Sequence, residues 1–170
     1  KTVSTQLDTA DILLAEDSNS GFEFFSSLYG GQAQCVSAKG KSNIFGFLQA
    51  HRQQKILVIA DGAAFGCEME KIMQLIRLGR NIILYLPESF EWLVLRAGII
   101  VDSEIKDVLA DPSAYIDSKK FFSWERFFTD LLVRNTKDTY LAYTKRSLNH
   151  AYLQDTMKRK IINSMFPLSF

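Results

Sequence analysis

Acidic residues follow two apolar segments that have the composition of buried strands. ILLAED ends in Glu16 and Asp17, and ILVIAD ends in Asp61. If both segments are central strands of a parallel sheet, their carboxyl ends meet at one crevice and the three carboxylates converge there. Crowded carboxylates repel each other, so such a cluster is typical of a site for a hard divalent cation, Mg²⁺ or Mn²⁺. The alternative is that Asp61 caps the following helix and that Glu16 is solvated.

Two further segments place charged side chains near the same crevice. LPESFEW follows another apolar stretch, so Glu88 or Glu91 can complete the ion site, or both can simply favour the start of a helix. Lys39 and Lys41 are the expected contacts for a phosphate group. The loop that begins at Asp61, DGAAFG, consists mainly of small residues, which allows a phosphate or a metal-bound water to approach the backbone.

Short apolar segments alternate with amphipathic segments along the first two thirds of the chain. Their periodicity predicts strands at residues 11–14, 34–37, 55–60 and 81–86, with residues 99–101 as a candidate fifth strand. It predicts helices at residues 20–29, 43–51 and 67–78. Because strands that alternate with helices of this length need parallel crossovers, we expect an α/β fold, a parallel-sheet Rossmann-like domain in three layers.

The pattern changes after Pro112. We expect an α/β domain over residues 1–111 and a helical C-terminal extension over residues 112–170. Ser123 is a candidate cap for a helix whose apolar stripe we expect to pack on the sheet domain. A second helical run is expected from about Lys137.

Charge is unevenly distributed, although the whole chain of 170 residues has a net charge of only +1. Residues 1–118 contain 10 basic and 15 acidic side chains, whereas residues 119–170 contain 10 basic and 4 acidic ones. The basic C-terminal part predicts contacts with nucleic acid or another acidic partner, and a solvated helix face is the alternative. The side chains expected to contact phosphates are Arg134, Lys145, Arg146 and residues 158–160.

Composition argues against several other classes of protein. Uninterrupted apolar stretches are far shorter than the roughly 20 residues that cross a bilayer, so we expect no membrane segment. Two cysteines cannot build a disulfide framework, which favours a cytoplasmic location. With only His51 and His150, neither a histidine metal cluster nor a Ser-His-Asp triad can be assembled.

Taken together, the strand ends resemble those of a Toprim domain, the catalytic fold of topoisomerases, bacterial primases and the overcoming-lysogenization-defect nucleases. That pattern has a Glu after its first strand, matched by Glu16, and an Asp-x-Asp-x-x-Gly loop after its third, matched by Asp61 and Gly66. GKSNIFGFL and LPESFEW resemble two further segments of the nuclease branch, and the second would supply Glu91. The resemblance covers about residues 11–95.

This resemblance implies metal-assisted phosphodiester cleavage, with Glu16 and Asp61 as ligands of the ion and Glu91 as a ligand or base. It also implies a separate ATPase partner, because nucleases of this branch commonly work with one and the chain contains no nucleotide-binding loop. The chain departs from the family at Ala63, which stands in place of the second Asp of the loop, and at Ser20, where an acidic residue often occurs. These departures leave a second hypothesis, a catalytically degenerate interaction or regulatory protein.

A third hypothesis comes from similarity to a response-regulator receiver domain. ILLAED supplies the acidic pair, and Asp61 would be the phosphorylated residue beside a bound Mg²⁺. Such a domain also needs a hydroxyl after its fourth strand and a Lys after its fifth, for which Ser89 and Lys106 are the candidates. This similarity implies a phosphoacceptor signalling function.

Overall fold

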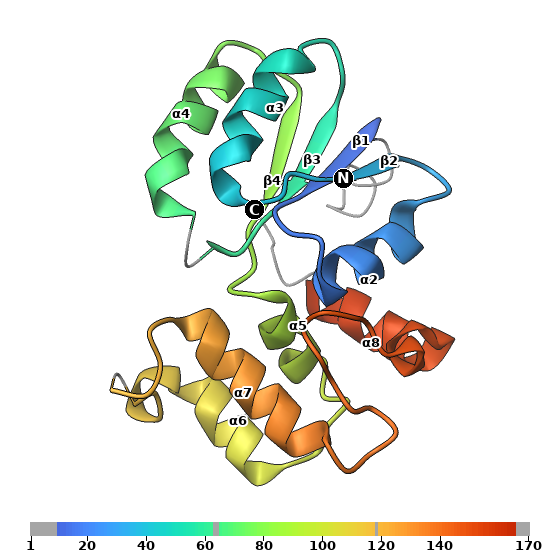
Figure 1. The fold of residues 1–170 in the computed structure, drawn as a ribbon, viewed down its shortest axis with the longest axis vertical. Coiled ribbons are helices and arrows are strands. Elements are labelled where there is room, and N and C mark those ends of the chain that lie inside the picture. Colours follow the sequence, from blue (N-terminus) through green and yellow to red (C-terminus); the bar gives the residue numbers. More distant parts are fainter. Residues whose placement is uncertain (1–9, 63–64, 118, 166–170) are drawn as a thin grey trace.

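The computed structural model describes residues 10–62, 65–117 and 119–165 and has a sheet at its centre (Figure 1). All four described strands run parallel, in the order β2–β1–β3–β4. They are β1 (Ile12–Ala15), β2 (Gln34–Ser37), β3 (Ile56–Ile59) and β4 (Ile82–Tyr85). The two central strands, β1 and β3, are buried along their whole length, as their unbroken apolar sequence requires.

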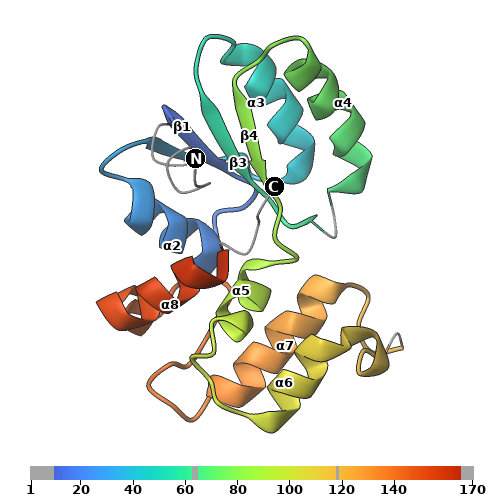
Figure 2. The ribbon, with the colours of Figure 1, turned by 180° about the vertical axis from the view of Figure 1, so that it is seen from behind.

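Helices cover both faces of the sheet, which gives three layers. They are α2 (Ser20–Tyr29), α3 (Ile44–Ala50), preceded by the 3₁₀ turn η1 (Lys41–Asn43), and α4 (Gly66–Arg77). Because successive strand residues point to opposite faces, Leu13 packs in the cluster that contains α2, whereas Leu14 packs with α3 and α4 (Figures 1 and 2). The predicted fold class, a three-layer parallel α/β domain, is confirmed.

The remaining helices gather beyond the end of the sheet at which β4 continues into α5 (Figure 1). They are α5 (Phe90–Arg96), α6 (Ser103–Ala110), η3 (Pro112–Ala114), α7 (Trp124–Thr136), η4 (His150–Leu153) and α8 (Asp155–Met165). Both α7 and α8 contact α5, and the apolar stripe of α7 belongs to the same buried cluster as Leu13. Ser123 caps α7 as predicted, since its Oγ accepts a 3.3 Å hydrogen bond from Arg126 N–H. No helix of the described residues is long and apolar enough to cross a membrane.

The candidate fifth strand at residues 99–101 does not form, so that prediction is wrong. Gly98 follows α5 with a left-handed φ of 65°, and the chain turns there instead of extending along the sheet. Asp102 then caps α6, its Oδ1 accepting a 2.7 Å hydrogen bond from Glu104 N–H. The short apolar run lies between a helix stop and a helix start, which its composition alone does not reveal.

The second predicted helix of the extension begins later than expected. Residues 137–149, called here the 137–149 segment, have no regular structure before η4 and α8. Side chains bind the backbone within it: Oγ1 of Thr136 accepts a 3.0 Å bond from Tyr143 N–H, and Nδ2 of Asn149 donates a 2.9 Å bond to Tyr140 O. Such bonds stabilise non-helical backbone in competition with the helix.

Candidate functional site

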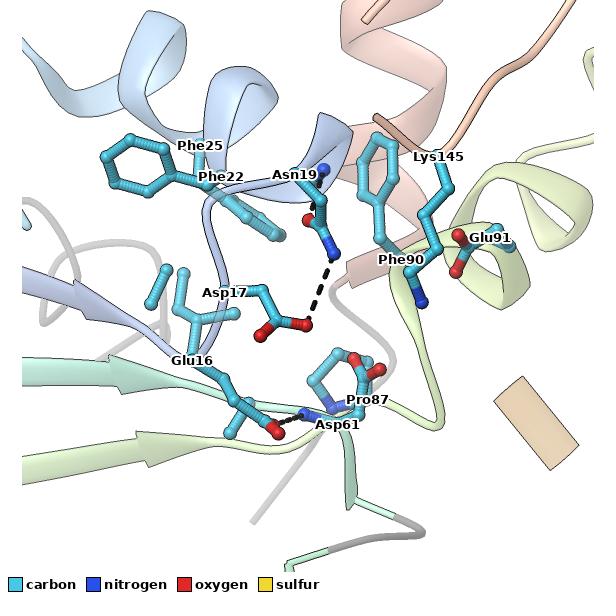
Figure 3. A pocket seen from close by; sticks show the side chains of 14 residues that line it. Glu16, Asp17, Asn19, Phe22, Phe25, Asp61, Pro87, Phe90, Glu91 and Lys145 are labelled. Carbon is cyan, nitrogen blue, oxygen red and sulfur yellow. Dashed lines mark hydrogen bonds between the residues drawn. The ribbon is translucent and has the colours of Figure 1, made fainter. Parts of the chain in front are cut away.

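The carboxyl ends of β1, β3 and β4 surround a small pocket (Figure 3). Its charged lining consists of Glu16, Asp17, Asp61, Glu91 and Lys145. The chain leaves β1 and β3 towards opposite edges of the sheet, so the pocket lies at the switch point where open α/β sheets bind ligands. Its volume of about 40 Å³ admits an ion with one or two water molecules.

Glu16 is tied to the beginning of the loop that carries Asp61. The Asp61 N–H donates a 3.2 Å hydrogen bond to Oε2 of Glu16. Burial raises the pKa of Glu16, the Asp61 N–H opposes this shift, and the negative charge of Asp17 adds to it. Two of the three residues predicted to hold a metal, Glu16 and Asp61, therefore lie at neighbouring strand ends and are joined by a direct bond.

Asp61 has the most strongly perturbed carboxyl group of the pocket. Burial, followed by the negative charges of Glu91 and Glu16, raises its pKa to about 8, while the positive charge of Lys145 acts in the opposite direction. Asp61 does not cap α4, because that helix has Phe65 at its cap position and no side-chain cap bond. A crowded carboxyl group of this kind is a candidate for binding a proton or a cation.

Glu91 lies deeper in the structure, with only 2% of the residue exposed. Oγ of Ser89 accepts a 3.1 Å bond from Trp92 N–H at the start of α5, which places Glu91 in the first helical turn. The hydroxyl of Tyr143 donates a 2.8 Å hydrogen bond to Oε1 of Glu91. Burial and the adjacent charge of Glu91 raise the pKa of Tyr143, so the phenol stays protonated and remains a donor.

Lys145 reaches the pocket because the 137–149 segment is fastened to α2. Ser20 N–H donates a 2.9 Å bond to Lys145 O, and Ser20 Oγ donates a 2.6 Å bond to Thr144 O. Three residues further on, Leu148 N–H donates a 3.1 Å bond to Glu23 Oε2. Lys145 is predicted from the sequence as one of the C-terminal bases that contact phosphates, and no spacing in the chain indicates that it meets the acidic residues.

Several predicted residues lie elsewhere. Lys39 is exposed, with a left-handed φ of 57°, and neither it nor Lys41 lines the pocket, although the charge of Lys41 lowers the pKa of Glu16. Glu88 is exposed and does not line the pocket, so of the two predicted glutamates only Glu91 joins the site. Ala63 lies outside the described residues.

No family model, curated protein or solved structure matches this chain. The Toprim resemblance therefore stays a prediction carried by Glu16, Asp61 and Gly66. What the pocket can do follows from its own side chains.

Gly62 has a structural role different from the predicted one. Its N–H donates a 2.6 Å bond to Pro87 O, and a Cβ at this position would lie 2.8 Å from Leu86 O. Glycine therefore lets the loop after β3 pack directly on the loop after β4, which brings Asp61 close to Glu91. At Gly66, a Cβ would meet no described atom within 4 Å, so close packing does not require glycine there.

The donor atoms of the pocket fit a metal ion that is only partly coordinated by protein side chains. In the described part of the chain, no group of three or more His, Cys, Asp and Glu side chains is placed to hold a metal ion. A cage built entirely of protein ligands is therefore not formed. The pocket nevertheless offers carboxylate oxygens, and Mg²⁺ is usually bound by one or two carboxylates together with water and substrate phosphates. Glu16 and Asp61 fit that role, and Asp17 lines the same pocket.

Proposed function

We propose that this protein is a nucleic-acid phosphodiesterase that uses Mg²⁺ or Mn²⁺ held by Glu16 and Asp61. The observation that carries the proposal is the convergence of four carboxylates and Lys145 on one small pocket at the switch point of the sheet. Burial raises the pKa of Asp61 most, and the negative charges of Glu91 and Glu16 raise it further. A buried carboxyl group beside two other carboxylates supports the binding of a cation there.

Each charged residue of the pocket has a separate role in this proposal. Glu16 and Asp61 would hold the ion, and Asp17 would add negative charge beside it. A bound divalent ion would supply Lewis-acid stabilisation of the phosphodiester. The ammonium group of Lys145 binds a non-bridging phosphate oxygen, a task for which lysine acts as a point charge.

Glu91 acts as an additional ligand or as the base. Tyr143 fixes its Oε1 through the 2.8 Å hydrogen bond, whereas Oε2 has no hydrogen-bond partner in the described part of the chain. The residue lines the pocket, so this second oxygen is the one available to accept a proton from an attacking water.

Calorimetric titration of the wild-type protein with Mg²⁺ and with Mn²⁺ tests the metal site directly. We expect binding that is lost in Asp61→Asn and retained in Glu88→Gln, which changes an exposed glutamate outside the pocket. Cleavage of labelled DNA and RNA with the same variants tests the activity. Equal metal binding by wild type and Asp61→Asn would contradict the proposal.

A second candidate function is a binding or regulatory subunit without catalytic activity. It is favoured by the lack of a three-ligand group in the described residues and by Ser20, whose buried hydroxyl binds the backbone where the resemblance expects an acid. If the wild type shows no cleavage, Ala63→Asp tests the origin of the site. A gain of metal-dependent cleavage would support a degenerate nuclease, and unchanged inactivity would favour a site with another purpose.

The phosphoacceptor hypothesis receives less support than these two. Ser89, its candidate hydroxyl, is fully buried and caps α5, and the strand that would carry its lysine is absent at residues 99–101. A separate ATPase partner and a cytoplasmic location remain parts of the main proposal. The first rests on the resemblance, and the second on the sparing use of cysteine.

A further inference from the structure

The acidic pocket is too small to hold a nucleotide. A volume of about 40 Å³ admits an ion, water or a phosphate oxygen, whereas sites for small organic ligands usually measure about 300–1,000 Å³. A nucleic-acid substrate must therefore place its sugars and bases on the surface beside the pocket.

A larger groove adjoins the pocket and shares Lys145 with it. The groove runs along α7 and the residues before it, measures about 700 Å³, and includes Lys120, Phe121 and Arg126 in its lining. Lys145 lines both cavities and pairs with Glu125 on α7. A chain of nucleotides lying in this groove would meet the acidic pocket at Lys145.

The charges of the groove favour an anionic ligand. Its two acidic residues already have cationic partners, because Glu125 pairs with Lys145 and Asp130 lies 3.3 Å from Nε of Arg134. Lys120 and Arg126, by contrast, pair with no carboxylate in the part of the chain that the structure describes. These two cations are available to phosphate groups.

The same surface presents aromatic rings beside the two cations. Phe122 lies beside the groove, not in its lining, and is 84% exposed. The Arg126 guanidinium, which does line the groove, lies 5.8 Å from the centre of the Phe122 ring. Phe121 is half-buried and packs edge-on against Phe127, with ring centres 5.4 Å apart, while Lys120 Nζ lies 5.1 Å from the Phe121 ring. An exposed ring flanked by unpaired cations is the arrangement with which proteins stack the bases of single strands.

We infer that the groove along α7 binds single-stranded nucleic acid, with phosphates on Lys120 and Arg126 and a base stacked on Phe122. Paired and stacked bases of a duplex cannot lie against Phe122 in this way, so the groove selects single strands. The inference rests on the proposed function for the kind of substrate, but the binding itself needs neither a metal nor cleavage.

Fluorescence anisotropy in EDTA measures this binding separately from catalysis. The probes are labelled oligo(dT) and oligo(rU) of about 20 nucleotides, which distinguish DNA from RNA, and a duplex of the same length. We expect tighter binding of a single strand than of the duplex, and a loss of about tenfold in affinity for Phe122→Ala and for Arg126→Ala. The affinity should also fall steeply as salt is raised.

Two substitutions on the other side of the sheet serve as matched controls. Lys71→Ala removes an exposed lysine from α4, and Leu78→Ala removes an apolar side chain that is 79% exposed at the end of α4. Both should bind like the wild type. Equal affinity for single strand and duplex, or no effect of Phe122→Ala, would overturn the inference. So would a dimer in size-exclusion chromatography that Phe122→Ala converts to a monomer.

The metal titration and this binding assay can fail independently. Absence of metal binding with intact single-strand binding would refute the proposed phosphodiesterase activity. The groove would still be a binding site for single strands. Metal-dependent cleavage together with unaltered nucleic-acid binding in the groove variants would refute the binding role of the groove. The proposed phosphodiesterase activity would then stand.

Discussion

The hydroxyl of Tyr143 donates a 2.8 Å hydrogen bond to Oε1 of Glu91, joining the 137–149 segment to the first turn of α5. Both residues are buried, so the bond is shielded from water. It fixes one oxygen of a carboxylate that lines the acidic pocket, and it fixes the chain two residues before Lys145. One contact therefore positions an acidic and a basic group of the same site.

Tyr143→Phe should destabilise the protein by about 1–3 kcal/mol, because it leaves a buried carboxylate without its donor. Urea denaturation of both proteins at neutral pH measures the difference. Tyr140→Phe is the matched control, since Tyr140 lies in the same segment but is 65% exposed. Equal losses in the two variants would show that the Glu91 bond does not contribute to stability.

Asp61→Asn should make the protein more stable at alkaline pH. The folded-state pKa of Asp61 is about 8, against 3.8 as its ordinary value, so the folded protein holds a proton that the unfolded chain has released. The stability associated with this proton is fully present below about pH 4 and is lost as the pH rises through 8. Above that pH the variant should exceed the wild type by roughly 1–3 kcal/mol, a value reduced for partial exposure.

Thermal unfolding at several pH values between acid and alkaline conditions measures this effect. Asp138→Asn is the control, because the Asp138 side chain is 86% exposed and lies outside the pocket. If the unfolding temperatures of the wild type and of Asp61→Asn changed in parallel with pH, the raised pKa of Asp61 would be contradicted.

Lys145→Ala should raise the pKa of Asp61 further, because the ammonium group lowers that pKa in the intact protein. NMR titration of the Asp61 carboxyl group measures the shift. The variant should also lose about 100-fold or more in phosphodiesterase activity, as expected when a phosphate-binding cation is removed. Lys137→Ala, which removes an exposed lysine of the same segment outside the pocket, should leave both quantities unchanged.

Gly62→Ala and Gly66→Ala should have opposite effects. The first places a Cβ 2.8 Å from Leu86 O and should destabilise the protein by about 2 kcal/mol or more. The second adds a Cβ in open space at the first residue of α4, where alanine favours the helix and should stabilise by about 0.4–1 kcal/mol. Chemical denaturation gives both values, and destabilisation of equal size in the two variants would refute the assigned role of Gly62.

Local pattern was sufficient to predict most of the sheet. Each described strand begins and ends within one residue of its prediction, because its apolar run is bounded by polar or turn residues on both sides. Residues 99–101 show the limit of this reasoning. A three-residue apolar run satisfies the same criterion, and only the turn at Gly98 and the cap at Asp102 reveal that no strand forms.

The acidic half of the candidate site was predictable, and the basic half was not. Glu16 and Asp61 follow strands, so the rule for parallel sheets places them together. Lys145 reaches the same pocket because Ser20 binds the backbone of Thr144 and of Lys145. Ser20 and Thr144 are 124 positions apart in the sequence. Contacts over such separations leave no periodic signal in the sequence, and Tyr143 was missed for the same reason.

The fastening of the 137–149 segment to α2 also fixes the order in which the pocket can be completed during synthesis. A chain emerges from the ribosome from its N-terminus, so all four carboxylates appear before Lys145. Until Leu148 has emerged and met Glu23, the ammonium group of Lys145 is not held where it offsets the repulsion around Asp61. The nascent α/β core therefore carries an incomplete and self-repelling pocket until the 137–149 segment has been synthesised.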